Sequence, residues 1–385
     1  MHFQLSAEQS LLRLRAREFA RQVVLPQVAL YDRTPAFPWE IFRRAREERL
    51  LHLCIPSSYN GPGLGILEQV IVAEELSWSC TGICAAVSLN ALAISALLLA
   101  GDPFQQEHFF SRLLAGQLCS FAVTEPEAGS DIAAIRTTAV RSTGEDVYIL
   151  NGRKIWISNA PDASFFLILA KTTPEQGHHG ISLFIVERAT PGLIVGPVRG
   201  KLGQQATLTA DIFLEDVRVP LSALLGPEDH GFKLALQVFD RSRPLVAAYG
   251  VGLIQRCLDE ALDYARRRRS MGKPIIEHQA IGNKIAEIAM SLEAARLLTY
   301  QSAWLLDSGQ QGTLQAAYAK AFAADTAMKA ATETLQIFGS AGYGTDLPIE
   351  KLLRDAKLLQ IYEGTSEIQR LIMQKALAGR SSART

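Results

Sequence analysis

The chain has 385 residues, 48% of them hydrophobic and 20% charged, which are the proportions of a globular protein with two or three domains. Its 39 basic residues balance its 39 acidic residues, which argues against nucleic acid or an anionic membrane as the main partner. The five cysteines and seven histidines show neither a disulfide framework nor paired metal-ligand spacing, so we expect no metal.

Residues 1–118 are predicted to form a helical region. Ser6 and Gln9 match a capping box and precede apolar residues at helical spacing. Further helices are expected over residues 38–52, 66–78 and 83–100. The first residues lack the basic stretch and apolar core of a secretory signal, so a cytoplasmic protein is expected.

The uncharged run from Ile83 to Ala100 reaches the lower limit of membrane-spanning length. It contains Ser88, Asn90 and Ser95, and no basic residues flank it. A helix buried inside a soluble bundle is therefore the favoured interpretation.

From residue 119 to residue 225 the hydrophobic pattern alternates, which predicts a compact β domain, either a barrel or a sandwich. Asn151-Gly152 lies between two alternating runs and predicts a hairpin with a type I′ turn. In the second strand of this hairpin, Lys154, Trp156 and Ser158 are expected to share one face. Other strands are predicted over residues 165–170, 181–187 and 210–219.

Residues 226–385 again show helical spacing, and their long helices with short connections predict a four-helix bundle. The four helices are expected over residues 231–269, 280–308, 313–338 and 366–378. Ser366 and Gln369 match a capping box at the start of the last helix. Residues 379–385 are expected to be a disordered tail.

Glu363 lies between the apolar segment 359–362 and Gly364, immediately before this last helix. A carboxylate in that place can be shielded from water and still exposed at the tip of a loop, as a base that removes a weakly acidic C–H proton requires. Alone, the pattern is equally typical of an acid that only favours the positive end of a helix dipole.

Glu363 does not stand alone, because five other segments form a family pattern with it. They are residues 121–131, 154–159, 268–273, 336–340 and 354–357. In this order and at these separations, the sequence resembles the acyl-CoA dehydrogenase family over nearly its whole length, in particular its short- and medium-chain FAD flavoproteins. The resemblance implies an α+β fold with an N-terminal helical domain (1–118), a middle β domain (119–225) and a C-terminal helical bundle (226–385).

The resemblance implies FAD as the cofactor. Residues that match contacts of the flavin ring are Phe121, Val123, Thr124, Ser130, Trp156 and Ser158. Arg268 and Ser270 match a pair that meets the FAD pyrophosphate, a group that suits the forked donors of arginine. Residues that match positions serving a flavin held largely in a neighbouring subunit are Arg268, Gln279, Gln336, Gly339 and Ser340. Thr365 and Glu367 match positions near the cofactor, and Ser340 departs from the family by replacing a common glycine.

For the substrate, the resemblance implies contacts from Ser130, Asp240, Arg243 and Gly364, with Glu363 as the catalytic base. Some branches of the family carry the base at the position of Ser242, which is not acidic here. The implied reaction is FAD-dependent α,β-dehydrogenation of an acyl-CoA thioester to the trans-2-enoyl thioester. Its electrons would pass to an electron-transferring flavoprotein, and the enzyme would be a homotetramer built as a dimer of dimers.

Two other functions stay open. Relatives in secondary metabolism desaturate acyl groups that are held on carrier proteins. A family member could also bind flavin without being a dehydrogenase, although Glu363 argues against this. Acyl chain length and branching are not determined by these motifs.

Overall fold

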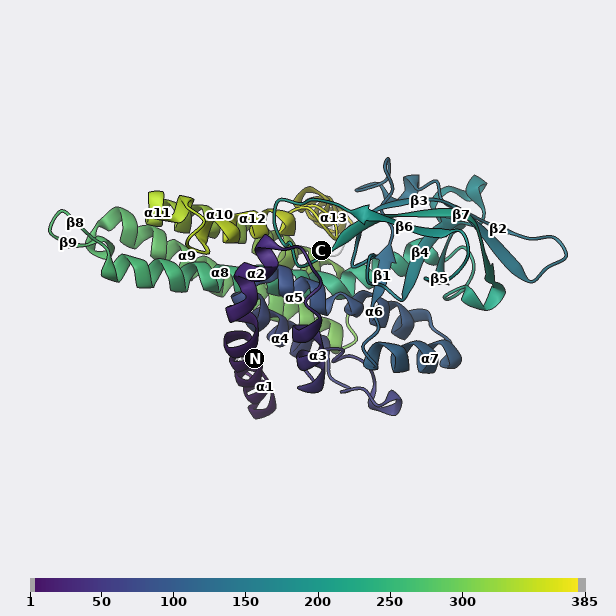
Figure 1. Cartoon of the computed structure of the whole chain (residues 1–385), viewed down its shortest axis with the longest axis horizontal. Coiled ribbons are helices and arrows are strands. Elements are labelled where there is room, and N and C mark those ends of the chain that lie inside the picture. Colours follow the sequence, from purple (N-terminus) through teal and green to yellow (C-terminus); the bar gives the residue numbers. More distant parts are fainter. Residues whose placement is uncertain (1–3, 380–385) are drawn as a thin grey trace, which may run out of the picture.

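A computed structural model describes residues 4–379 of the chain. Helices, then a sheet, then helices again follow one another along it, so the predicted fold class is confirmed (Figure 1). Of the tail predicted to be disordered, residues 380–385 lie outside the described residues, and Gly379 ends the last helix.

The N-terminal region consists of α1 (Ala7–Phe19), α2 (Val28–Arg33), α3 (Trp39–Glu47), α4 (Ile66–Ser79), α5 (Thr81–Ser88), α6 (Asn90–Ala100) and α7 (Pro103–Leu114). The capping box of Ser6 and Gln9 is confirmed at the start of α1. α3 ends before the predicted residue 52, because Arg49 and His52 adopt positive φ angles that a helix cannot contain. α7 was missed, although Asp102 caps it and Pro103 occupies its first position, which is a typical helix start.

The segment Thr81–Ala100 is long and apolar enough to cross a membrane by length and composition alone. In the structure it forms α5 and α6, which break at Leu89, and 67% of its most apolar window is buried. α5 packs against α4 and α8, and α6 packs against α8 and β1. This burial is that of a core helix, as the composition predicted.

The middle region is a seven-stranded sheet of β1 (Cys119–Ala122), β2 (Thr138–Arg141), β3 (Val147–Ser158), β4 (Phe165–Lys171), β5 (Ile181–Glu187), β6 (Leu193–Val198) and β7 (Thr209–Pro220). The strand order is β1-β4-β2-β3-β7-β6, with β5 paired to β4.

The sequence of the central strand β4 is continuously apolar because both of its faces are buried. Phe165, Leu167 and Leu169 belong to the core shared with α6 and α7, whereas Phe166 and Ile168 belong to the core shared with β3 and β7. Successive residues of a strand point to opposite faces, so both faces of β4 are buried. One face of β4 therefore packs against α6 and α7, and its other face packs in the core that includes β3 and β7.

The predicted hairpin at Asn151-Gly152 is wrong. β3 continues through both residues as one strand, with a register shift against β7 between Leu150 and Gly152. A Cβ at position 152 would lie 2.4 Å from the Thr137 side chain, so the glycine serves a close approach of the residue that precedes β2. Pairing along the whole length of β7 outweighs the local turn preference of Asn-Gly, and the turn between β2 and β3 lies around Gly144.

The expectation that Lys154 shares a face with Trp156 and Ser158 is also wrong. Trp156 has φ +59° and lies in a second register shift of β3, which interrupts the alternation of side chains. Lys154 is fully buried, and its Nζ lies 2.7 Å from Glu125 Oε1 and donates to the Val123 carbonyl at 3.1 Å. Although burial alone would raise the pKa of Glu125, the Lys154 ammonium lowers it.

The C-terminal region consists of α8 (Gly231–Arg267), α9 (Gln279–Asp307), α10 (Thr313–Phe338), α11 (Ser340–Tyr343), α12 (Ile349–Leu359) and α13 (Ser366–Ala378). β8 (Arg269–Ser270) and β9 (Lys273–Pro274) form a short hairpin between α8 and α9. Figure 1 shows α8, α9 and α10 along the long axis of the molecule, with β8 and β9 at the end opposite the sheet.

The four predicted helices are present, and α12 is an addition. Its apolar residues Ile349, Leu352, Ala356 and Leu359 follow helical spacing, so the signal for it was available. The predicted capping box of the last helix is wrong, because the cap is Thr365, which accepts the Ile368 N–H at 3.2 Å.

The pair of Lys154 and Glu125 predicts a large loss of stability on substitution. Lys154→Met leaves a buried carboxylate without its cation, which is expected to lower the free energy of unfolding by about 3–5 kcal/mol. Lys233→Met, on the exposed surface of α8, is the matched control and should leave the unfolding transition unchanged. Thermal and urea unfolding of both variants tests this, and equal behaviour of the two would contradict it.

Candidate active site

Glu363 lies in the turn between α12 and α13, at the intersection of two cavities. Its φ is +53° and that of Gly364 is +89°, so two successive residues adopt left-handed conformations. This conformation is costly for a residue with a side chain and is maintained only where the surroundings impose it. The Gly364 carbonyl accepts hydrogen bonds from Lys320 Nζ at 2.7 Å and from Gln369 Nε2 at 2.9 Å.

The environment of the Glu363 carboxylate acts on its charge in two opposing ways. Burial raises its pKa, while a hydrogen bond from Ser242 Oγ and the positive charges of Lys320 and Arg243 oppose that rise. A carboxylate shielded from water but supported by donors and cations is a stronger base than an exposed one and still ionises.

The first cavity at Glu363, of about 460 Å³, is mainly apolar. Leu89 and Leu92 approach from the α5–α6 segment, Phe121 from β1, and Leu236 and Phe239 from α8. The sheet and the helices must therefore both be in place before this cavity exists.

The second cavity, of about 580 Å³, also has mainly apolar walls, but it carries more cationic side chains than the first. Lys201, Arg354 and Lys357 line it, together with Ile361 and Thr365. The two cavities have eight lining residues in common: Thr124, Gly129, Ser130, Trp156, Ser158, Tyr362, Glu363 and Gly364. A carboxylate in this position can take a proton from a molecule in the apolar cavity while a second molecule lies in the cationic one.

Most of the predicted site residues meet here. The predicted residues that line one or both cavities are Phe121, Val123, Thr124, Ser130, Trp156, Ser158, Arg243, Glu363, Gly364 and Thr365. Asp240 does not line them, because its carboxylate pairs with Arg243 and accepts from Thr313 Oγ1 at 2.5 Å. Glu367 lies on the exposed surface of α13 and lines neither cavity.

A second group of predicted residues lies at the far end of the long helices. Arg268, Ser270, Gly339 and Ser340 line a cavity of about 490 Å³ where β8 and β9 meet the end of α10. Gln279 begins α9 beside it, and Gln336 lies in the last turn of α10. Figure 1 places this end opposite the sheet, so one chain does not bring the two groups together.

The residues of the site that were not predicted include Tyr362, which lines both cavities, and Lys320 and Gln369, which hold the Gly364 carbonyl. Lys320 carried a signal, since it lies on an alanine-rich helix face with the buried residues Ala317 and Ala324.

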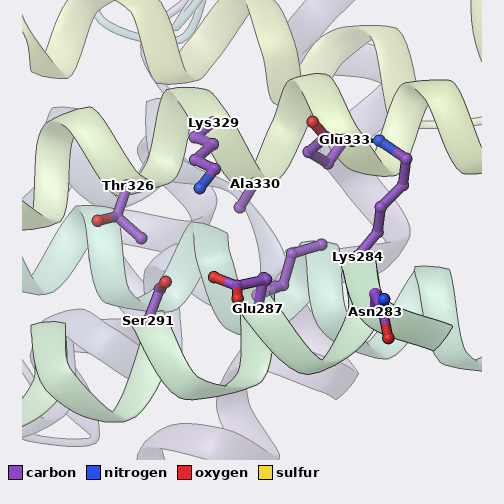
Figure 2. Close-up of a pocket in the computed structure, with 9 residues that line it drawn as sticks. Asn283, Lys284, Glu287, Ser291, Thr326, Lys329, Ala330 and Glu333 are labelled. Atoms are coloured by element: carbon purple, nitrogen blue, oxygen red, sulfur yellow. Dashed lines mark hydrogen bonds and ion pairs between the residues drawn. The ribbon is translucent and has the colours of Figure 1, made fainter. Parts of the chain in front are cut away.

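A further cavity of about 210 Å³ lies between α9 and α10 (Figure 2). Polar side chains line it, and Lys284 of α9 pairs across it with Glu333 of α10. This pair connects the two helices, and none of the predicted site residues takes part. Within residues 4–379, no group of three or more histidine, cysteine or acidic residues is arranged to hold a metal ion.

A shielded carboxylate at the tip of a turn, where two helical regions and a sheet meet, is suited to remove a proton from carbon. The family models for the N-terminal, middle and C-terminal domains of acyl-CoA dehydrogenase match residues 6–117, 120–217 and 229–378. The chain belongs to the acyl-CoA dehydrogenase family, and the prediction of an FAD-dependent oxidoreductase of that family is confirmed.

Individual relatives match along their whole length. An acyl-CoA dehydrogenase of Bacillus subtilis (strain 168) is 38% identical over 374 residues, which are 97% of this chain and 98% of the relative. Butyryl-CoA dehydrogenase from Megasphaera elsdenii has a TM-score of 0.95 and 34% identity, covering 98% of this chain and 100% of its own. A chain in the structure of the electron transferring flavoprotein of Acidaminococcus fermentans has a TM-score of 0.94 and 36% identity, covering 98% of this chain and 99% of its own.

The hydrogen bond from Ser242 predicts a shift in the titration of Glu363. Ser242→Ala removes a donor that favours the ionised carboxylate, so the pKa of Glu363 should rise further. Infrared spectra recorded against pH would follow the carboxyl band, which Glu363→Gln identifies by its loss. Ser308→Ala, an exposed change at the end of α9, is the control, and an unmoved titration in Ser242→Ala would disprove the role of this bond.

Proposed function

We propose that this protein catalyses the FAD-dependent α,β-dehydrogenation of an acyl-CoA thioester to the trans-2-enoyl thioester. The observation that carries the proposal is the position of the Glu363 carboxylate between an apolar cavity and a cationic cavity. The apolar cavity suits an acyl chain, and the match to butyryl-CoA dehydrogenase supports a thioester substrate.

In this mechanism Glu363 removes the α-proton of the thioester. The apolar walls hold the acyl chain and exclude water, which strengthens the carboxylate as a base. Gly364 has no side chain, so the thioester carbonyl can approach the turn. The backbone N–H of Glu363 is then the proposed donor to the carbonyl oxygen, and this hydrogen bond stabilises the charge that develops there.

The cationic cavity is the proposed site of the flavin, and its residues fit that group. The Trp156 indole is 48% exposed and offers a flat surface for a flat ring, while Thr124 and Ser158 supply hydroxyl groups beside it. Ring contacts are proposed for Thr124, Ser130, Trp156 and Ser158, which line this cavity, and for Phe121 and Val123, which line the adjoining apolar cavity. Thr365 and Glu367 are proposed to lie near the cofactor. Bound FAD would supply the acceptor for the hydride that leaves the β-carbon.

The remaining cofactor residues are proposed to act on the flavin of a neighbouring subunit. Their location opposite the Glu363 cavities supports this proposal, because one chain cannot bring both groups to one molecule of FAD. They are Arg268, Ser270, Gln279, Gln336, Gly339 and Ser340. The proposed assembly is a homotetramer, a dimer of dimers.

Arg243 is proposed to contact the substrate together with Ser130 and Gly364, since all three line the apolar cavity. Asp240 is proposed to act through Arg243, with which it pairs. The proposed electron acceptor is an electron-transferring flavoprotein, in line with the match to a chain in such a structure. The proposed domain limits are residues 118 and 225, and the proposed location is the cytoplasm.

Glu363→Gln tests the base. It keeps the shape of the side chain and removes its basicity, so FAD should stay bound while flavin reduction slows by at least about 10²–10⁴-fold. The measurement is anaerobic bleaching of the flavin by a panel of acyl-CoA thioesters and by acyl groups loaded on carrier proteins. Glu107→Gln, on the exposed surface of α7, is the control. Reduction of Glu363→Gln at the wild-type rate would exclude this base, and reduction by carrier-held substrates alone would favour the other substrate class.

Arg268→Ala tests the neighbouring-subunit proposal. The loss of a forked phosphate donor should lower the ratio of flavin to protein after gel filtration, and Arg268→Lys should restore it only in part. Arg266→Ala is the matched control, because Arg266 is an exposed arginine in the last turn of α8, two residues before Arg268. Light scattering should report two or four chains for the wild type, and a monomer that retains one FAD per chain would contradict the proposal.

A further inference from the structure

Lys320 is a lysine in an unusual place. Its relative exposure is 0%, and it lies in the middle of α10 among buried alanines. A lysine that is fully buried normally requires a partner for its charge, because removing an ammonium from water is costly. The identity of that partner therefore indicates what the residue does.

Within residues 4–379, Lys320 donates its hydrogen bond to the turn that carries the proposed base, Glu363. Its Nζ donates to the carbonyl of Gly364 at 2.7 Å. A neutral carbonyl satisfies a donor but does not neutralise a charge, and in the described part of the chain no carboxylate lies within ion-pair distance of Lys320. Its positive charge is therefore available to the groups around it.

The other ionisable groups near Lys320 and Glu363 are paired, exposed or neutral. Arg243 of α8 faces Glu363 but pairs with Asp240. Asp325 of α10 pairs with Arg370 of α13. Three more groups complete the set, namely the exposed Glu367 of α13, the buried Tyr249 of α8, and Tyr362, which precedes the base. Lys320 is thus the cation near Glu363 that has no carboxylate of its own.

The charge of Lys320 is present at neutral pH. Burial lowers the pKa of this lysine to about 8, and the largest opposing influence is the charge of Glu363. The ammonium and the carboxylate therefore stabilise each other's ionised forms across the turn.

We propose that Lys320 is a positioning residue for the base: its ammonium holds the Gly364 carbonyl, and with it the left-handed turn, and its charge keeps the Glu363 carboxylate ionised. This inference rests on the proposed role of Glu363. It adds a residue from α10, outside the turn, to the machinery that prepares the base.

Lys320→Met removes both the hydrogen bond and the charge in a side chain of similar length. Lys320→Gln removes the charge and keeps a hydrogen-bond donor. This variant allows the same measurement if the methionine variant does not fold. Lys329→Met is the matched control, since Lys329 lies on the same helix and lines the separate cavity between α9 and α10 (Figure 2). Thermal unfolding establishes which variants are folded.

The measurement is exchange of the α-protons of acetyl-CoA with D₂O, followed by NMR against pH with the FAD-loaded protein. Acetyl-CoA has no β-hydrogen, so the assay reports the base without hydride transfer. Loss of a nearby cation raises the pKa of a carboxylate by about 1 unit or more. The acidic limb of the exchange profile should therefore move up by about one pH unit in both Lys320 variants, with about a tenfold slower exchange below it, and should not move in Lys329→Met.

An acidic limb that stays in place in a folded Lys320 variant overturns the inference. A general loss of structure would lower the exchange rate at every pH but would not move the limb, which separates positioning from folding. Glu363→Gln is measured alongside. If it exchanges as fast as the wild type, the proposed base is wrong; if it is inactive while the Lys320 variants match the wild type, only the inference about Lys320 fails.

Discussion

The proposed site depends on one requirement, that the Glu363 carboxylate be shielded from water and still ionised. Shielding alone would protonate it, because burial disfavours charge. Ser242 from α8, Lys320 from α10 and Gln369 from α13 meet this requirement by contacting the carboxylate or the turn that carries it. Three helices must therefore pack correctly before the proposed base is in place.

The sheet contributes the opposite wall of the site through an irregularity in one strand. A regular β3 would place Lys154 and Trp156 on one face. The register shift at Trp156 directs the indole to the cavity, while Lys154 turns into the core and pairs with Glu125. The β-bulge thus separates a structural ion pair from a surface on which a flat ring can lie.

The length of α8, α9 and α10 separates the two groups of predicted cofactor residues. The group around Trp156 lies where the bundle meets the sheet, and the group around Arg268 lies at the other end (Figure 1). Residues that serve one cofactor from opposite ends of a chain require a second chain. Assembly and cofactor binding are therefore linked in the proposed function.

The sequence by itself determined the order of the three regions, the long helices and the motif around Glu363, because hydrophobic periodicity and short motifs are local properties. It also indicated α12 and Lys320, although the signals of helical spacing and of a lysine among alanines went unused. It could not reveal that Asn151-Gly152 continues a strand, since that outcome depends on pairing with β7. Only the tertiary structure decided that Asp240 accepts a hydrogen bond from Thr313 and that Lys320 reaches the Gly364 carbonyl, because residues far apart in the chain meet only when the helices pack.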